Sequence, residues 1–119
     1  MLHVFGCTHH ETSRISVNIR NLFENAAPPA SGERFETLLQ HKNLVIERIC
    51  SSVDLPLSQY IQPQDEWVLL LQGTAKIEID GKVESLKSGD YVFLPANTPH
   101  CVQKVSEGAL WLAVHLHPQ

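Results

Sequence analysis

The sequence predicts a single all-β domain, and three observations support this prediction. The chain has 119 residues, which is the size of one ordinary domain. Hydrophobic residues make up 43% of it, enough for one core. From Leu44 onward the hydrophobic pattern has a period of two, which is typical of strands. Many short runs separated by tight-turn residues are typical of a sandwich or a barrel.

The expected strands follow one another closely in the second part of the chain. The clearest turn is Asp80-Gly81, a dipeptide that strongly favours a β-hairpin. The unbroken apolar run at residues 67–71 predicts a strand buried on both faces, in which Leu69 belongs to the core. The complete set of expected strands is 44–51, 67–71, 74–79, 82–86, 91–94, 101–105 and 110–116.

The first thirty residues differ from the rest of the chain. Pro28 and Pro29 interrupt regular structure because proline lacks a backbone N–H and restricts the residue before it. We therefore expect residues 1–30 to form an N-terminal arm and residues 31–119 to form the barrel.

A short helix is expected where the barrel begins, at about residues 32–40. Ser31 is a suitable N-cap, and Glu33 is an acid in the first turn, where the helix dipole favours one. Three apolar residues then follow at the i, i+3, i+4 spacing of a buried helical stripe, namely Phe35, Leu38 and Leu39.

Composition argues against several classes of partner. The net charge is -4 and there is no basic run, so nucleic acid is not expected as a partner. No apolar stretch approaches the roughly 20 residues that span a bilayer, and the N-terminus lacks the pattern of a secretory signal. The three cysteines are widely spaced and odd in number, which predicts free thiols and a cytoplasmic location.

The middle of the chain resembles the two motifs of the cupin superfamily. Glu66 and Gly73 (EWVLLLQG) match the end of the first motif. Gly89, Pro95 and His100 (GDYVFLPANTPH) match the second. The spacing between the motifs is similar to that of small single-domain cupins. The resemblance implies a double-stranded β-helix, or jelly-roll barrel, with its functional site in the lumen.

The chain departs from the family pattern at several positions. Tyr60 and Gln62 stand where the first motif has its His-x-His pair. Asn97 replaces the glycine after the proline, which is a mild change because asparagine tolerates positive φ. Asp54 and Lys104 replace the opening Gly and the closing Asn.

These residues define the expected site. Residues i and i+2 of a strand share a face, so Tyr60 and Gln62 should point together. The resemblance directs that face into the lumen, beside Glu66 and His100. We expect Glu66 and His100 to be the catalytic pair, and Tyr60 and Gln62 to orient the ligand or cofactor.

The same resemblance implies a divalent metal, namely iron, manganese, nickel or zinc, held by His100, Glu66 and Gln62. Gln62 offers only a neutral oxygen, and the phenol of Tyr60 resists deprotonation because its ordinary pKa is near 10. Metal binding should therefore be weaker than at a three-histidine site. The alternative is that Glu66 is a surface acid and His100 a hydrogen-bonded core histidine.

The faces of three further side chains stay open. Glu47 and Arg48 lie on opposite faces of their strand, and one of them should point toward the lumen or a subunit contact. An inward Arg48 would favour an anionic ligand such as a carboxylate; the alternative is an exposed pair on an edge strand. His115 is in phase with Trp111 and Ala113, on a face that is either internal or external.

Three functions are compatible with the sequence. The first is an enzyme acting on a small organic acid, either through a divalent metal or through general acid–base catalysis. The second is a metal-free module that binds or senses a small molecule. The third is a structural dimer with a vestigial site. Exposed strand edges favour a homodimer in which residues 1–30 contact the neighbouring subunit.

Overall fold

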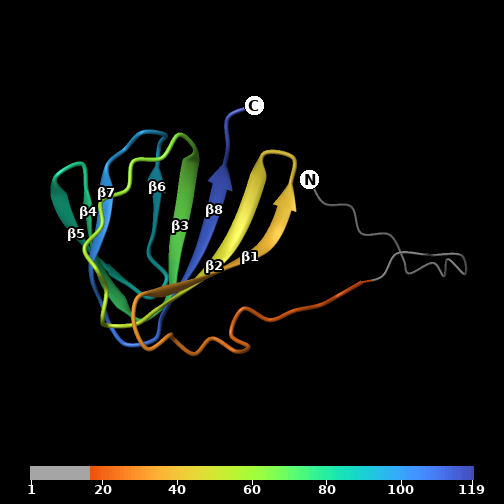
Figure 1. The fold of residues 1–119 in the computed structure, drawn as a ribbon, viewed down its shortest axis with the longest axis horizontal. Coiled ribbons are helices and arrows are strands. Elements are labelled where there is room, and N and C mark those ends of the chain that lie inside the picture. The colour runs from red at the N-terminus through yellow and green to blue at the C-terminus, as the bar shows by residue number, and fades with distance from the viewer. Residues whose placement is uncertain (1–16) are drawn as a thin grey trace, which may run out of the picture.

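The structure is a computed structural model that describes residues 17–119. In this range the chain forms eight strands and no helix (Figure 1). Residues 17–119 therefore contain no helix that is long and apolar enough to cross a membrane. The strands are β1 (Glu33–His41), β2 (Leu44–Ser51), β3 (Asp65–Gln72), β4 (Thr74–Ile79), β5 (Lys82–Lys87), β6 (Tyr91–Leu94), β7 (His100–Val105) and β8 (Ala109–Leu116).

The strands form two antiparallel sheets. One sheet has the order β1-β2-β8-β3-β6, and the other has the order β5-β4-β7 (Figure 1). Buried apolar side chains from both sheets meet in one core, which includes Val68, Leu70, Ile77 and Trp111. The predicted all-β jelly-roll class is confirmed.

Side chains alternate along β3, and this alternation decides what faces the core. Glu66, Val68 and Leu70 are 7%, 5% and 0% exposed, whereas Trp67 and Leu69 are half-buried on the other face. The prediction that this run is buried on both faces, with Leu69 in the core, is therefore wrong. Apolar residues at nearly every position concealed the period of two, because the outer face of β3 also carries large side chains.

The helix expected at residues 32–40 is also wrong, because β1 occupies Glu33–His41 and pairs with β2. The register shifts between Thr37 and Leu39, as at a β-bulge. The extra residue breaks the period of two, so that Phe35, Leu38 and Leu39 have the sequence spacing of one helical face. Phe35 is 54% exposed, so the three apolar residues do not form a buried helical stripe.

The predicted turn residues are found at positions where the backbone has a positive φ. Asp80 and Gly81 have φ values of 49° and 82°, and they connect β4 to β5 as a two-residue hairpin. Asn97 has a φ of 64°, the conformation that its sequence position suggested. Gly73 is required for a second reason, because a Cβ atom there would lie 2.6 Å from Ser106 Oγ.

The segment before β1 is attached to the outside of the five-stranded sheet. Arg48 is 5% exposed and donates hydrogen bonds to the carbonyl oxygens of Leu22 and Glu24. It also donates to Glu36 Oε1 at 2.6 Å. Arg34 adds a hydrogen bond to the carbonyl oxygen of Asn25. Arg48 therefore points away from the lumen, and the boundary predicted at residue 30 stays a prediction.

Candidate functional site

A cavity of about 80 Å³ lies inside the barrel, between the two sheets. Seven apolar side chains line it: Phe35, Ile49, Val68, Ile77, Leu94, Val102 and Trp111. Seven polar side chains complete the lining: Glu33, Glu47, Tyr60, Gln62, Glu66, His100 and His115. The cavity thus combines an apolar wall with a concentrated set of titratable groups, as is usual for small-molecule sites.

Glu66 lines the cavity because it lies on the inward-facing side of β3. Its Oε1 atom is buried and accepts no hydrogen bond from any residue in the described part of the chain. Burial is the main cause that raises the pKa of this carboxyl group above its usual value. The negative charges of Glu47 and Glu33 add to the rise, while His115 and His100 oppose it.

His100, the first residue of β7, faces Glu66 across the cavity. Its Nδ1 atom lies 3.0 Å from the carbonyl oxygen of Thr98, which can only accept, so Nδ1 carries the proton of this hydrogen bond. In the neutral ring, Nε2 is then unprotonated. Nε2 lies 3.7 Å from Glu66 Oε1, too far for a direct hydrogen bond. These two atoms therefore face one another without a direct hydrogen bond between them.

Tyr60 and Gln62 come from the loop before β3. The backbone of Tyr60 pairs with that of His100 through hydrogen bonds of 2.8 and 3.0 Å. The two rings stack with their centroids 5.9 Å apart. Burial is the largest cause that raises the pKa of the Tyr60 phenol, so the neutral form is favoured. All four residues expected at the site thus line the same cavity.

The sequence left open whether Glu47 and His115 face inward, and both do. His115 Nε2 donates to Glu47 Oε1 at 2.8 Å, which raises the pKa of His115. The other ring nitrogen lies 3.4 Å from the side-chain amide of Gln64. The period of two in β8, which puts His115 in phase with buried Trp111, was the signal that could have located it.

Glu33 is a lining residue that sequence reasoning missed. Ser51 Oγ donates to Glu33 Oε2 at 2.8 Å, and Trp111 Nε1 donates to Ser51 Oγ at 3.1 Å. Burial is the largest cause that raises the pKa of the Glu33 carboxyl group. The mistaken helix concealed this residue, since a first-turn acid would face solvent.

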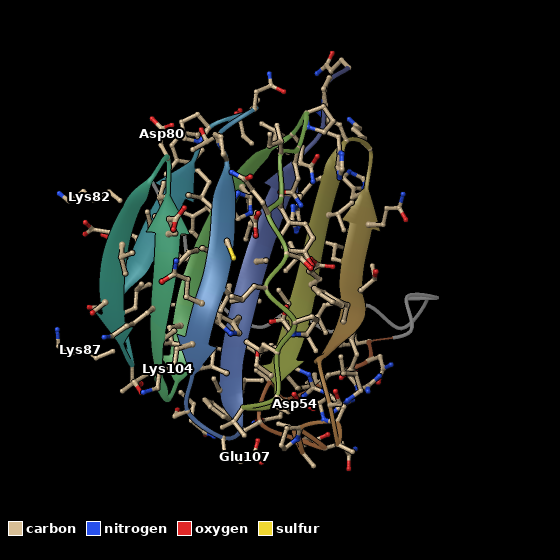
Figure 2. The ribbon with its side chains drawn as sticks, turned by 60° about the vertical axis from the view of Figure 1, so that its left-hand side comes forward. Asp54, Asp80, Lys82, Lys87, Lys104 and Glu107 are labelled. Atoms are coloured by element: carbon tan, nitrogen blue, oxygen red, sulfur yellow. The ribbon has the colours of Figure 1, made fainter. Side chains whose placement is uncertain are left out.

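The lining contains no lysine or arginine within residues 17–119. Arg48 makes its hydrogen bonds on the outer face of the sheet, with Leu22, Glu24 and Glu36. Figure 2 shows Lys82 and Lys87 at the outer edge of the barrel on β5, with side chains directed away from it. The lumen is therefore acidic, apart from the two histidines.

The residues fit a divalent metal only in part. Glu66 Oε1 and His100 Nε2 are two potential metal ligands that lie 3.7 Å apart, and Gln62 lines the same cavity. However, no group of three or more His, Cys, Asp or Glu side chains within residues 17–119 is arranged to hold a metal ion. His115 is already engaged by Glu47. The chain thus supplies two strong donors and one neutral amide.

Comparison with known proteins identifies the family of this chain. The model of the cupin domain matches residues 56–116. A candidate mannose-6-phosphate isomerase from Ralstonia eutropha JMP134 has 37% sequence identity and a TM-score of 0.77, over 86% of this chain and 100% of that chain. No curated protein matches the chain.

Two other solved structures resemble the fold. A conserved protein of unknown function from Streptococcus pyogenes has 24% identity and a TM-score of 0.74, covering 88% of this chain and 91% of that chain. The protein TT1209 from Thermus thermophilus has 20% identity and a TM-score of 0.75, covering 86% of this chain and 100% of that chain. At these identities the likeness concerns the fold alone.

Proposed function

We propose, from the premise that this chain belongs to the cupin family, that its barrel lumen binds a small molecule between Glu66 and His100. One observation carries the proposal: the buried Oε1 atom of Glu66 has no hydrogen-bond partner in residues 17–119. A buried polar atom without a partner costs about 1–3 kcal/mol. A ligand that donates a hydrogen bond in the lumen would remove this cost.

The chemistry of the pair suits proton transfer. Burial raises the pKa of Glu66, so its carboxyl group keeps a proton to higher pH than an exposed glutamate does. His100 Nε2 is an acceptor whose ring is oriented by Thr98. In this proposal Glu66 and His100 exchange a proton with the bound molecule, while Tyr60 and Gln62 orient it.

A divalent metal is the second candidate for the space between Glu66 and His100, favoured by the same partnerless oxygen. His100, Glu66 and Gln62 would hold it. When bound, the metal would polarise an oxygen of the substrate as a Lewis acid. With one imidazole, one carboxylate and one amide, its affinity should be lower than at a three-histidine site.

The acidic lining weighs against an anionic substrate. The name of the Ralstonia protein concerns a phosphorylated sugar, and phosphate recognition generally uses arginine or lysine. The described lining of this cavity offers neither. The same feature weighs against the small organic acid expected from the sequence.

The proposal can be tested with lumen variants and one matched control. His100→Ala and Glu66→Gln remove the pair, and His41→Ala removes an exposed histidine outside the lumen. Binding of small amines, polyols and acids is followed by NMR, and binding of Zn²⁺, Mn²⁺ and Fe²⁺ by calorimetry. We expect both lumen variants to lose binding and His41→Ala to retain it. Unchanged binding in His100→Ala and Glu66→Gln would reject the site.

A further inference from the structure

Three carboxylate side chains from three different strands face the same cavity. They are Glu33 on β1, Glu47 on β2 and Glu66 on β3. Burial is the main cause that raises the pKa of Glu66, His115 and His100 oppose the rise, and the negative charges of Glu47 and Glu33 add to it. Such crowding of like charges is unfavourable unless a positive charge lies among them.

In two of these carboxylates, one oxygen atom accepts a hydrogen bond from the protein and the other does not. Glu33 Oε2 accepts from Ser51 and Glu47 Oε1 accepts from His115, each at 2.8 Å. Their second oxygens accept no hydrogen bond from another residue of the described range. Each group is therefore oriented by the protein and retains an acceptor for a ligand.

Glu66 distinguishes this set from an ordinary acidic surface cluster. The residue is 7% exposed and lines the cavity, and its Oε1 atom has no hydrogen-bond partner among residues 17–119. A carboxylate on the surface would satisfy its oxygens with solvent. A buried one needs a donor, and a ligand in the lumen that carries an N–H or O–H group can provide it.

The walls favour an organic cation over a bare metal ion. The rings of Phe35, Tyr60 and Trp111 line the cavity, and aromatic faces attract alkylammonium groups. No group of three or more metal-ligating side chains is arranged for an ion in the described range. The cavity, at about 80 Å³, is smaller than the roughly 150 Å³ cavity that accepts benzene.

From these observations we infer that the lumen binds a small organic ammonium ion of a few non-hydrogen atoms, held by the carboxylates of Glu33, Glu47 and Glu66. This inference rests on the proposed lumen site and names its ligand class. The ammonium group donates to the free carboxylate oxygens, and its carbon atoms contact the apolar wall. An anion of the same size would add to the repulsion among the carboxylates.

The test compares three probes of similar size that differ in charge: 2-aminoethanol, 1,2-ethanediol and glycolate. Trp111 is one of two tryptophans and lines the cavity, so its indole N–H signal reports binding in NMR titrations. We expect 2-aminoethanol to bind more tightly than 1,2-ethanediol, and glycolate not to bind.

Glu47→Gln and Glu33→Gln should each weaken 2-aminoethanol binding about tenfold, because a charge-assisted hydrogen bond becomes a neutral one. Glu84→Gln removes the same charge from an exposed position on β5 and should change nothing. The spectrum of each variant establishes that it is folded before titration, and the two lumen variants serve as independent tests.

Equal affinities for the three probes would overturn the inference, as would full 2-aminoethanol affinity in both folded lumen variants. The lumen site itself would survive these outcomes if His100→Ala still abolished binding. Absence of any Trp111 shift with all three probes would also overturn the inference. The metal titrations of wild type and His100→Ala would then decide the proposed function separately.

Discussion

Gln62 stands at a position where the cupin motif carries a histidine, and it lines the cavity beside Glu66 and His100. Gln62→His would replace a neutral amide with an imidazole, a much better ligand for first-row metals. We expect this variant to bind Zn²⁺, Mn²⁺ or Fe²⁺ more tightly than the wild type in calorimetric titrations. If neither protein bound any of these metals, the metal candidate would be abandoned and the lumen treated as a metal-free pocket.

At the scale of single residues, the motif positions were predictable and the supporting residues were not. Glu66, His100, Tyr60 and Gln62 were located by the resemblance, and they line one cavity. Tyr60 and Gln62 lie in a loop and not on the expected strand, so strand phase did not place them. Glu47 could not be assigned, because alternation separates it from Arg48 without saying which face is internal. That decision depends on the partner strand and on the segment that covers the outer face.

The strand β3 provides a test of side-chain phase. Leu70 is 0% exposed and belongs to the core, whereas Leu69 is half-buried on the outer face. Leu70→Ala should lower the free energy of unfolding by roughly 2–5 kcal/mol, as deletion of a buried large side chain does. Leu69→Ala should lower it less. Urea unfolding curves of both variants measure the difference, and a larger loss in Leu69→Ala would contradict the observed phase.

The attachment of the N-terminal segment to β1 and β2 should depend on pH through Glu36. The hydrogen bond from Arg48 is the main cause that lowers the pKa of Glu36, and the charges of Arg48, Arg34 and Arg20 contribute. Because the folded-state pKa lies below the unfolded value, ionised Glu36 stabilises the fold above the unfolded pKa, near 4.5. This stabilisation is lost as the pH falls through the folded pKa.

Glu36→Gln should therefore have a lower melting temperature than the wild type at pH 7, and the difference should shrink as the pH approaches 3. Thermal unfolding followed by circular dichroism gives both values. Glu84→Gln, whose ion pair with Lys82 is exposed, serves as the control and should match the wild type. A constant difference at all pH values would mean that the contact with Arg48 is unimportant for stability.

At the scale of elements, patterning predicted seven of the eight strands and failed at the first. The expected strand at residues 44–51 coincides with β2, and the Asp80-Gly81 hairpin is present. In β1 the bulge near Leu38 breaks the period of two, so the local pattern favoured a helix. Pairing with β2 overrides that local preference, and such long-range pairing is not visible in a short window.

At the scale of the whole molecule, the homodimer stays a prediction with a clear test. The outer edge of β1 pairs with no strand within residues 17–119, and exposed strand edges tend to be covered. Light scattering at micromolar concentration should give twice the chain mass of 13.4 kDa. A mass of one chain across this range would rule out the dimer without affecting the lumen site.

The central claim is that a small molecule binds between Glu66 and His100. The most direct measurement is the long-range ¹H–¹⁵N NMR spectrum of the histidine side chains, recorded while 2-aminoethanol, 1,2-ethanediol or Zn²⁺ is added. We predict that neutral His100 carries its proton on Nδ1, and that its Nε2 signal shifts with at least one of these additions while exposed His41 does not respond. A proton on Nε2 together with no response from His100 to any addition would contradict the account.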